Sequence, residues 1–321
     1  MLNLDTKKRK TVEYGRYGLY FLIPFFVAFL LFQLYPLFYT FYKSLVYRHA
    51  TGRNVFTDEF GFGNFKNYVF GKGGQDFWNA LLITIGLWIL NFIPQILLSL
   101  LLAAWFTDSH NKLKGTGAYK VIMYMPNIIT AATIALLFYN LFTDTGPLTK
   151  LFQDIGLVSK KGVLNNRWGS FFLIAFIQFW MWYGNTMIVL IAGILGISPS
   201  LYEAAMVDGA SSRQQFFKIT LPLLKPILQF TLVTSAIGGL QMFDIPSLLN
   251  RGNPVIKVGD KTVYSTKTVV MLIKEYASGD TKEDLGRACA YSVILFIITL
   301  AVSMIFYMAT RTKKEKGAKK K

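Results

Sequence analysis

The sequence predicts an all-α membrane protein with six transmembrane helices, both termini in the cytoplasm and a cytoplasmic loop between helices four and five. Of the 321 residues, 53% are hydrophobic and 16% are charged, a balance typical of membrane proteins rather than of soluble domains. Six apolar stretches are each long enough to cross a hydrocarbon core, which takes about 20 residues. Because these stretches are continuous rather than alternating, they indicate helices and exclude a β-barrel.

The six stretches divide the chain into spans and connecting loops. The expected spans are residues 17–42, 78–106, 121–142, 169–197, 223–248 and 288–310. Several of them contain proline, which is tolerated in a membrane helix where neighbouring helices satisfy the freed carbonyl group. These interior prolines are Pro24, Pro36, Pro94, Pro126 and Pro246.

The N-terminal segment 1–16 is basic and precedes the first apolar stretch, as in a signal peptide. No small-residue cleavage pattern ends that stretch, so we interpret it as an uncleaved span. The one cysteine, Cys289, excludes an intramolecular disulfide and is expected to be a small packing residue.

Positive charge near the spans predicts which side of the membrane each loop occupies. The numbers of lysine and arginine residues hardly differ between the two sides, and the long outer loops, at about 43–77, 143–168 and 249–287, cross largely regardless of charge. The dense clusters in segment 1–16 and in the basic tail 311–321 therefore place both termini in the cytoplasm. The net charge of +17 comes from basic residues that cluster at the termini and between the spans. At these places they can contact anionic lipid headgroups, so the charge does not indicate a nucleic-acid-binding surface.

The loop between the fourth and fifth spans has local signals for two short helices joined by a turn. Glu203-Ala204-Ala205 favours a helix, and Asp208-Gly209 favours its end. Arg213–Leu221 can form the second helix, and Pro222 suits the first turn of the span that follows. The predicted orientation places this loop in the cytoplasm.

This loop resembles the EAA loop of permease subunits in ATP-binding-cassette (ABC) importers. That motif reads Glu-Ala-Ala, three residues, Gly, nine residues, Ile and then Leu-Pro, and Gly209, Ile219 and Leu221-Pro222 occupy its fixed positions. The resemblance implies docking on a separate ATPase, with 210–217 as the docking helix. The expected ATPase-coupling residues are Glu203, Ala204, Ala205, Asp208, Gly209, Ala210, Ser211, Arg213, Phe217 and Pro222. A helix lying on lipid is the weaker alternative, because its carboxylates would face anionic headgroups.

Most of the chain also resembles the MalF-like membrane subunit of carbohydrate importers of the maltose-transporter type. The supporting segments are Leu22-Ile23-Pro24 with Tyr35-Pro36 and Ser44, Gly63–Tyr68, Gly146-Pro147-Leu148 with Leu151 and Gly156-Leu157, Phe243-Asp244 with Gly252-Asn253-Pro254, and Gly286–Leu295. The EAA loop is the specific part of this resemblance.

The transport path is expected near the membrane midplane, where substrate sites of transporters tend to lie. At that depth the fourth span carries Gln178, Trp180, Trp182, Tyr183, Gly184 and Asn185, and the fifth carries Thr234, Ser235, Gly238, Gly239 and Gln241. Aromatic rings beside amides and hydroxyls suit sugars, whose C–H faces stack on rings while their hydroxyls need hydrogen-bond partners. Ordinary helix packing or an interfacial aromatic belt are the alternatives.

The family resemblance also implies sugar contacts from these two helices. The expected path residues are Trp180, Tyr183, Gly184, Asn185, Met187, Gly239, Leu240 and Gln241. Asp244 lies 18 residues beyond Pro226, or about 27 Å along a helix. We therefore expect it near the outer surface, as part of an outer gate.

These observations predict a multi-pass subunit of the cell membrane that moves a sugar or oligosaccharide, delivered by an extracytoplasmic binding protein, in an ATP-driven importer. The expected partners are a second, MalG-like permease, an ATPase dimer, the binding protein and the lipid bilayer, with no nucleic acid. A permease for another solute, such as glycerol phosphate, a peptide or a polyamine, remains an alternative.

An enzymatic role is poorly supported. The sequence contains no Gly-x-x-x-x-Gly-Lys-Ser/Thr phosphate loop, so we expect no bound cofactor here and the use of ATP and magnesium by the partner ATPase. No catalytic or metal site is expected, because His49 and His110 are predicted to lie on opposite sides of the membrane. A membrane enzyme acting on lipid-linked sugars would need paired carboxylates or a metal motif.

Overall fold

The computed structural model describes residues 15–52, 55–108, 114–157, 162–258, 261–278 and 282–310. Most of the expected N-terminal segment (1–14), the whole basic tail (311–321) and His110 lie outside the described residues.

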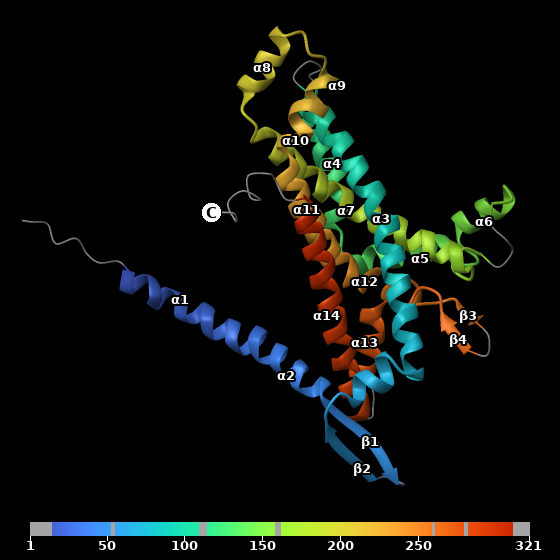
Figure 1. The fold of residues 1–321 in the computed structure, drawn as a ribbon. Helices are drawn as coiled ribbons and strands as arrows, with labels where there is room; N and C mark the ends of the chain where they lie inside the picture. Colours follow the sequence, from blue (N-terminus) through green and yellow to red (C-terminus); the bar gives the residue numbers. More distant parts are fainter. Residues whose placement is uncertain are drawn as a thin grey trace, which may run out of the picture.

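Four long helices form the body of the molecule. They are α3 (Gln75–Thr107), α7 (Arg167–Leu195), α11 (Lys225–Leu240) and α14 (Lys282–Thr310), and they run roughly along one direction in Figure 1. Helices α3 and α7 are the most extensively packed pair, and α11 packs on α14. Buried residues such as Leu87, Ile174 and Ile177 fill the core between α3 and α7.

The first apolar stretch extends away from this body. Helix α1 (Gly15–Phe29) continues through a π-helical turn (Leu30–Leu34) into α2 (Tyr35–Ser44). The main contact of this unit with the bundle lies at its end, where α2 packs on α14 and the rings of Phe41 and Phe296 lie 6.1 Å apart. Figure 1 shows the rest of the unit projecting from the other helices.

The third expected span is divided into two helices. Helix α4 (Thr116–Ile128) and helix α5 (Ala131–Phe142) differ in direction by 87°. Ile129 and Thr130 adopt extended backbone conformations, and the Thr130 side chain accepts a hydrogen bond from the backbone N–H of Thr133, which begins α5. This corrects the expectation of one continuous helix over 121–142.

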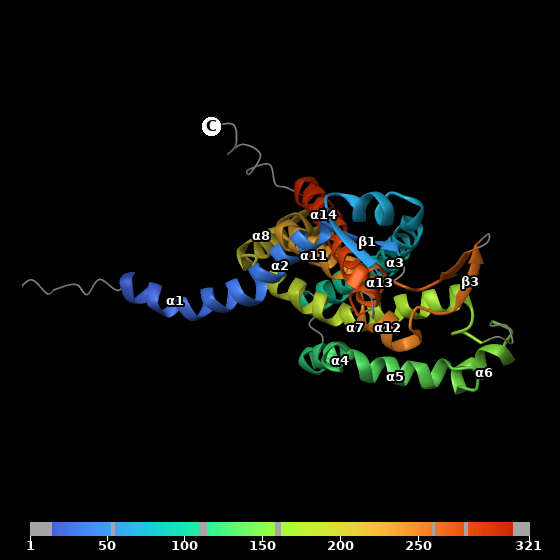
Figure 2. The ribbon, with the colours of Figure 1, turned by 90° about the horizontal axis from the view of Figure 1, so that it is seen from below.

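Short elements gather around the end of the bundle that we expect to face outward. Strands β1 (Val46–Gly52) and β2 (Val55–Phe60) form an antiparallel hairpin, and β3 (Val255–Val258) pairs with β4 (Lys261–Tyr264). The remaining elements there are the π-helical turn Phe65–Val69, the 3-10 turn Lys72–Gly74, α6 (Pro147–Asp154), α12 (Asp244–Asn250) and α13 (Val269–Ala277). Figure 2 shows α4, α5 and α6 following one side of the molecule.

The described part of the chain has five helical segments that are long and apolar enough to cross a membrane, or up to six if the bent pair α4–α5 counts as one span. The fifth of the expected stretches consists of α11 and α12, because the helix is interrupted at residues 241–243. The helical membrane class is therefore confirmed, whereas the count lies between five and six.

Candidate functional site

Two regions of the described chain surround the residues that the sequence analysis expects to be functional. One is the loop between α7 and α11, which we call the EAA segment (residues 199–223). The other is a cavity between α3, α7 and α11, which we call the central cavity.

The EAA segment folds as two short helical arms joined at Gly209. The first arm is α8 (Pro199–Val207). The second consists of α9 (Ser212–Gln215), a π-helical turn (Phe216–Thr220) and α10 (Leu221–Leu223). The expected helix–turn–helix is therefore present.

Gly209 ends the first arm in a left-handed conformation, with φ of +75°. The backbone N–H of Ala210 donates to the carbonyl of Ala205 at 2.8 Å, and that of Gly209 donates to Met206 at 3.0 Å. This pair of bonds is a Schellman motif, in which glycine is favoured because it has no Cβ. Open space surrounds the position of a Cβ at Gly209, so the backbone conformation, and not crowding, is what requires glycine.

The second arm begins with a capping box. The Ser211 hydroxyl accepts a hydrogen bond from the backbone N–H of Gln214, and the Gln214 side chain accepts one from the N–H of Ser211. Because both ends of the turn are fixed in this way, the angle between the arms is defined by local hydrogen bonds.

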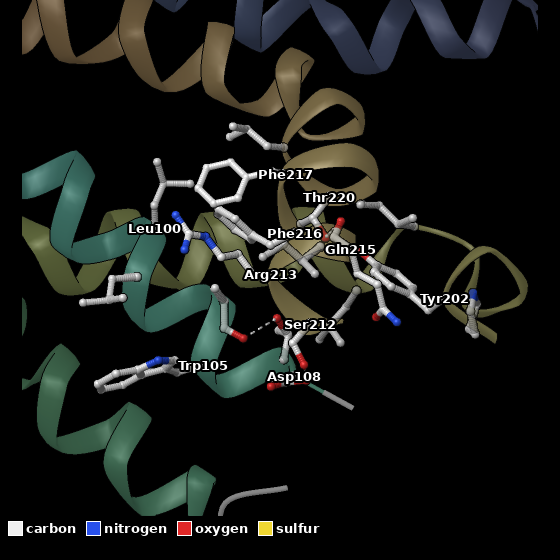
Figure 3. A pocket seen from close by; sticks show the side chains of 18 of the residues that line it. Leu100, Trp105, Asp108, Tyr202, Ser212, Arg213, Gln215, Phe216, Phe217 and Thr220 are labelled. Atoms are coloured by element: carbon white, nitrogen blue, oxygen red, sulfur yellow. Dashed lines mark hydrogen bonds between the residues drawn. The ribbon is translucent and has the colours of Figure 1, made fainter. Parts of the chain in front are cut away.

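Side-chain contacts connect the two arms with each other and with the bundle. The hydroxyls of Tyr202 and Thr220 lie 2.9 Å apart and link the arms. Ser212 donates to Asp108 at the end of α3 over 3.4 Å. A cavity of about 800 Å³ separates the arms from the ends of α3 and α7, and Figure 3 shows Arg213, Phe216 and Trp105 around it. The EAA segment is thus held at its base and stands clear of the bundle elsewhere.

Exposed apolar side chains lie on both arms. Val207 is 89% exposed, and Leu201 and Met206 on α8 and Phe217 on the second arm are also exposed. The carboxylates of Glu203 within α8 and of Asp208 at its end are exposed as well. The sequence prediction gave the docking role to 210–217, whereas the exposed apolar groups extend the candidate contact surface to α8. Of the other expected coupling residues, Ala204, Ser211, Arg213 and Pro222 are exposed, and Ala205 and Ala210 are half-buried.

The central cavity has a volume of about 580 Å³. Its walls come from α3, from the junction of α4 and α5, from α7, from α11 and from residues 241–245. The polar and aromatic residues that line it are Trp88, Asn91, Gln95, Asn127, Gln178, Trp182, Asn185, Thr186, Phe230, Thr231, Thr234, Ser235, Gln241, Phe243 and Asp244.

Some of these polar groups stabilise the walls. Gln95 donates to the Thr186 hydroxyl at 2.7 Å, and Asn127 donates to the carbonyl of Met181 at 3.2 Å. The Trp88 ring nitrogen donates to the Ser235 hydroxyl at 3.0 Å and so joins α3 to α11. Gly239 permits this contact, because a Cβ there would overlap the indole ring.

Other amides of the cavity have no such role. The side chains of Gln178, Asn185 and Gln241 make no hydrogen bond with any residue in the described ranges. Gln178 is 9% exposed, and its amide is not among the buried polar atoms without a partner in the described residues, so it is accessible from the cavity that it lines. Together with the half-exposed ring of Trp182, these amides could bind the hydroxyls and the C–H face of a sugar.

The expected path residues divide between the central cavity and the helix interfaces. Asn185, Gly239, Gln241 and Asp244 line the cavity. Trp180, Tyr183, Gly184, Met187 and Leu240 do not, because their side chains or backbones contact other parts of the protein. The Trp180 ring packs on Phe138 at 5.7 Å, the Tyr183 hydroxyl contacts the Met123 sulfur at 3.4 Å, Gly184 lies against the backbone of Met123, and Met187 and Leu240 are fully buried.

Helix geometry explains this division. The cavity-lining positions of α7 are 178, 181, 182, 185, 186 and 189, which follow the three-to-four residue spacing of one helix face. Positions 180, 183, 184 and 187 lie on the other faces. Of the expected path residues on α7, only Asn185 lies on the cavity-lining face, and contact with a substrate stays a prediction for all of them.

Sequence reasoning missed the contribution of α3. Trp88, Asn91 and Gln95 line the central cavity and recur at three-to-four residue spacing in an otherwise apolar span. Polar residues inside a membrane span usually face the bundle interior or a cavity, so the signal was available in the sequence.

Comparisons with known proteins agree with these features. Residues 80–312 match the protein family described as binding-protein-dependent transport system inner membrane component. The lactose transport system permease protein LacF of Rhizobium radiobacter is 32% identical over 203 residues, which are 63% of this chain and 66% of that protein. The chain therefore spans slightly less than two thirds of LacF.

A further relative and a solved structure cover more of the chain. The trehalose/maltose transport system permease protein MalF of Thermococcus litoralis is 29% identical over 265 residues, which are 81% of this chain and 84% of that protein. A chain in the crystal structure of a bacterial alginate ABC transporter, solved with an alginate pentasaccharide-bound periplasmic protein, superposes with a TM-score of 0.69. It is 24% identical and covers 93% of this chain and 96% of its own length, so it shares the fold.

Proposed function

The chain belongs to the family of binding-protein-dependent transport system inner membrane components, and from this premise we propose that it is the permease subunit of an ATP-driven importer of a sugar or oligosaccharide. It is a multi-pass membrane protein of the cell membrane. In this proposal an extracytoplasmic binding protein delivers the substrate, and ATP hydrolysis takes place in a separate ATPase dimer. This chain itself is expected to bind no cofactor, and the partner ATPase uses ATP and magnesium.

The central cavity is the observation that carries the sugar assignment. Gln178, Asn185 and Gln241 offer amides with no partner among the described residues, and Trp182 offers a ring beside them. Sugars are bound by this combination, since each hydroxyl needs a hydrogen-bond partner and the C–H face stacks on an aromatic ring. The names of the lactose and the trehalose/maltose relatives support the same substrate class.

The EAA segment is the proposed contact with the ATPase. Val207 and Leu201 are exposed apolar side chains on α8, where Glu203 and Asp208 supply exposed carboxylates, and Phe217 is an exposed apolar side chain on the second arm. An exposed apolar patch with a charged rim is typical of a protein–protein interface. The capping bonds at both ends of the turn let the two arms move as one body when the partner moves.

A second, MalG-like permease is proposed to cover the unit α1–α2. The most apolar window of Tyr17–Ser44 contains no buried residue among its described side chains, and the unit projects from the bundle (Figure 1). Membrane helices gain stability from packing on other helices as well as from lipid. The projecting unit is therefore suited to lie along the neighbouring permease.

Transport assays on the reconstituted four-component complex test the function. The complex, in proteoliposomes with ATP supplied on the ATPase side, should take up labelled oligosaccharides only when both ATP and the binding protein are present. A complex that takes up a peptide or a polyamine under these conditions, and no saccharide, would contradict the sugar assignment.

Cysteine labelling tests the proposed orientation, with both termini in the cytoplasm. In a Cys289→Ala background, single cysteines at Asn67 and Asn165 should react with an impermeant reagent added to intact cells, and one at Ser211 should not. Labelling of Ser211→Cys from outside would place the EAA segment on the wrong side for an ATPase.

A further inference from the structure

The central cavity has an uneven charge distribution. Among the described residues that line it, Asp244 carries the only formal charge, and the other polar groups are amides and hydroxyls. Asp244 is exposed at the start of α12, directly after Phe243, whose ring also lines the cavity.

Asp244 differs from three ion-paired carboxylates at this end of the bundle. Asp58 has Arg48 at 2.6 Å, Glu275 has Lys267 at 2.5 Å, and Asp76 has Arg287 at 3.9 Å. No cation of the described residues forms an ion pair with Asp244. A cation, Lys274, lies near the preceding residue, Phe243, with its amino group 4.7 Å from the centroid of the Phe243 ring. Lys274 does not line the cavity.

An unpaired carboxylate at the wall of a cavity changes the electrostatic potential inside the cavity enough to be measured. Clefts with low-dielectric walls focus the potential of the charges that line them. At an effective dielectric constant of about 20, a unit charge about 10 Å away changes the local concentration of a monovalent ion roughly tenfold. Anionic solutes are therefore depleted from the central cavity, whereas neutral solutes are unaffected.

We propose that Asp244 sets the charge preference of the central cavity and makes the path selective for neutral saccharides over anionic ones, such as uronates and phosphorylated sugars. This inference rests on the proposed function as a saccharide permease. The amides of Gln178, Asn185 and Gln241 recognise hydroxyls without requiring charge, and the Asp244 carboxylate can accept hydrogen bonds from sugar hydroxyls. The same carboxylate repels a sugar acid at close range.

Charged thiol reagents measure this preference without knowledge of the substrate. Single cysteines replace Thr234 and Gln241, two exposed residues of the cavity wall, in a Cys289→Ala background of the complete complex. The matched control is a cysteine at Asn67, an exposed residue on the outer side that does not line the cavity. The measured quantity is the ratio of reaction rates with a cationic and an anionic methanethiosulfonate of similar size.

The ratio at Thr234→Cys and Gln241→Cys should exceed the ratio at Asn67→Cys by several-fold to about tenfold. Asp244→Asn should remove most of this excess and leave the control unchanged. Lys274→Gln should raise the ratio, since it removes the opposing charge. An unchanged ratio in Asp244→Asn, or cysteines at both cavity positions that do not react at all, would overturn the inference.

Uptake assays separate this inference from the proposed function. The wild-type complex is offered neutral oligosaccharides and the corresponding uronic acids, and uptake confined to the neutral forms is expected. Uptake of the acids alone overturns the charge preference and leaves the saccharide permease intact. If neither class is taken up while the rate ratio still responds to Asp244, the sugar assignment fails and the charge preference stands.

Discussion

Replacement of Gly209 gives the sharpest test of the EAA segment. Gly209 has φ of +75°, and nothing lies within 4 Å of the position of a Cβ. A Cβ therefore introduces no clash, and the direct effect of a substitution is on the backbone conformation. The left-handed conformation costs an ordinary L-residue about 1–2 kcal/mol, a β-branched residue more, and asparagine least.

These costs predict an order of activities. We expect Gly209→Asn to transport nearly as well as the wild type, Gly209→Ala to transport less, and Gly209→Val to transport least. Since about 1.4 kcal/mol corresponds to a factor of ten, a strain of about 1–3 kcal/mol predicts a loss of roughly fivefold to 150-fold for valine. The membrane spans, whose backbone hydrogen bonds are satisfied internally, should still insert normally.

The assay is ATP-dependent uptake, together with co-purification of the ATPase from the same membranes. Gly117→Val is the matched control, because Gly117 also has open space around it but lacks a positive φ. Wild-type uptake and full ATPase retention in Gly209→Val would refute the argument that this turn connects ATP hydrolysis to transport.

Three further predictions follow from the two sites. Glu203→Lys should lower ATPase retention by about fivefold, in line with the strength of exposed ion pairs; retention equal to the wild type would remove Glu203 from the contact. Trp182→Ala should reduce uptake with little change in melting temperature, whereas Trp180→Ala should lower the melting temperature of the complex by loosening its contact with α5; the reverse pattern would restore Trp180 to the path. Gly239→Ala should displace the ring of Trp88 and reduce both stability and uptake, and unchanged melting would show that the ring moves freely.

Local signals in the sequence predicted local features of the fold. Continuous apolar runs located α3, α7 and α14, because a span must satisfy its backbone bonds within one helix. The end of α8 at Gly209 and the start of the second arm followed from short-range preferences for caps and turns. The hydrogen bonds of Ala210 and Gln214 show why these preferences were sufficient at that place.

Features that depend on contacts between distant residues were not predicted. The apolar pattern of 121–142 does not reveal that the chain changes direction between α4 and α5. The cap at the start of α5, where the Thr130 side chain accepts from the N–H of Thr133, is a local signal for a new helix but not for its direction. The face of α7 that lines the cavity depends on where α3 and α11 pack, which the sequence of α7 does not reveal. Trp180 and Trp182 look equally suited to a sugar path in the sequence. The fold distinguishes them, because the Trp180 ring packs on Phe138 and the Trp182 ring lines the cavity.

The two sites belong to one continuous stretch of chain. The second arm of the EAA segment leads through Thr220 and α10 directly into α11, whose far end carries Ser235 and Gly239 at the wall of the central cavity. Trp88 contacts both of these residues and ties that end to α3. A helix transmits displacement along its axis because its packed turns deform little. A movement of the EAA segment therefore reaches the cavity wall through α11, and the Trp88 contact is where α3 must either follow α11 or separate from it.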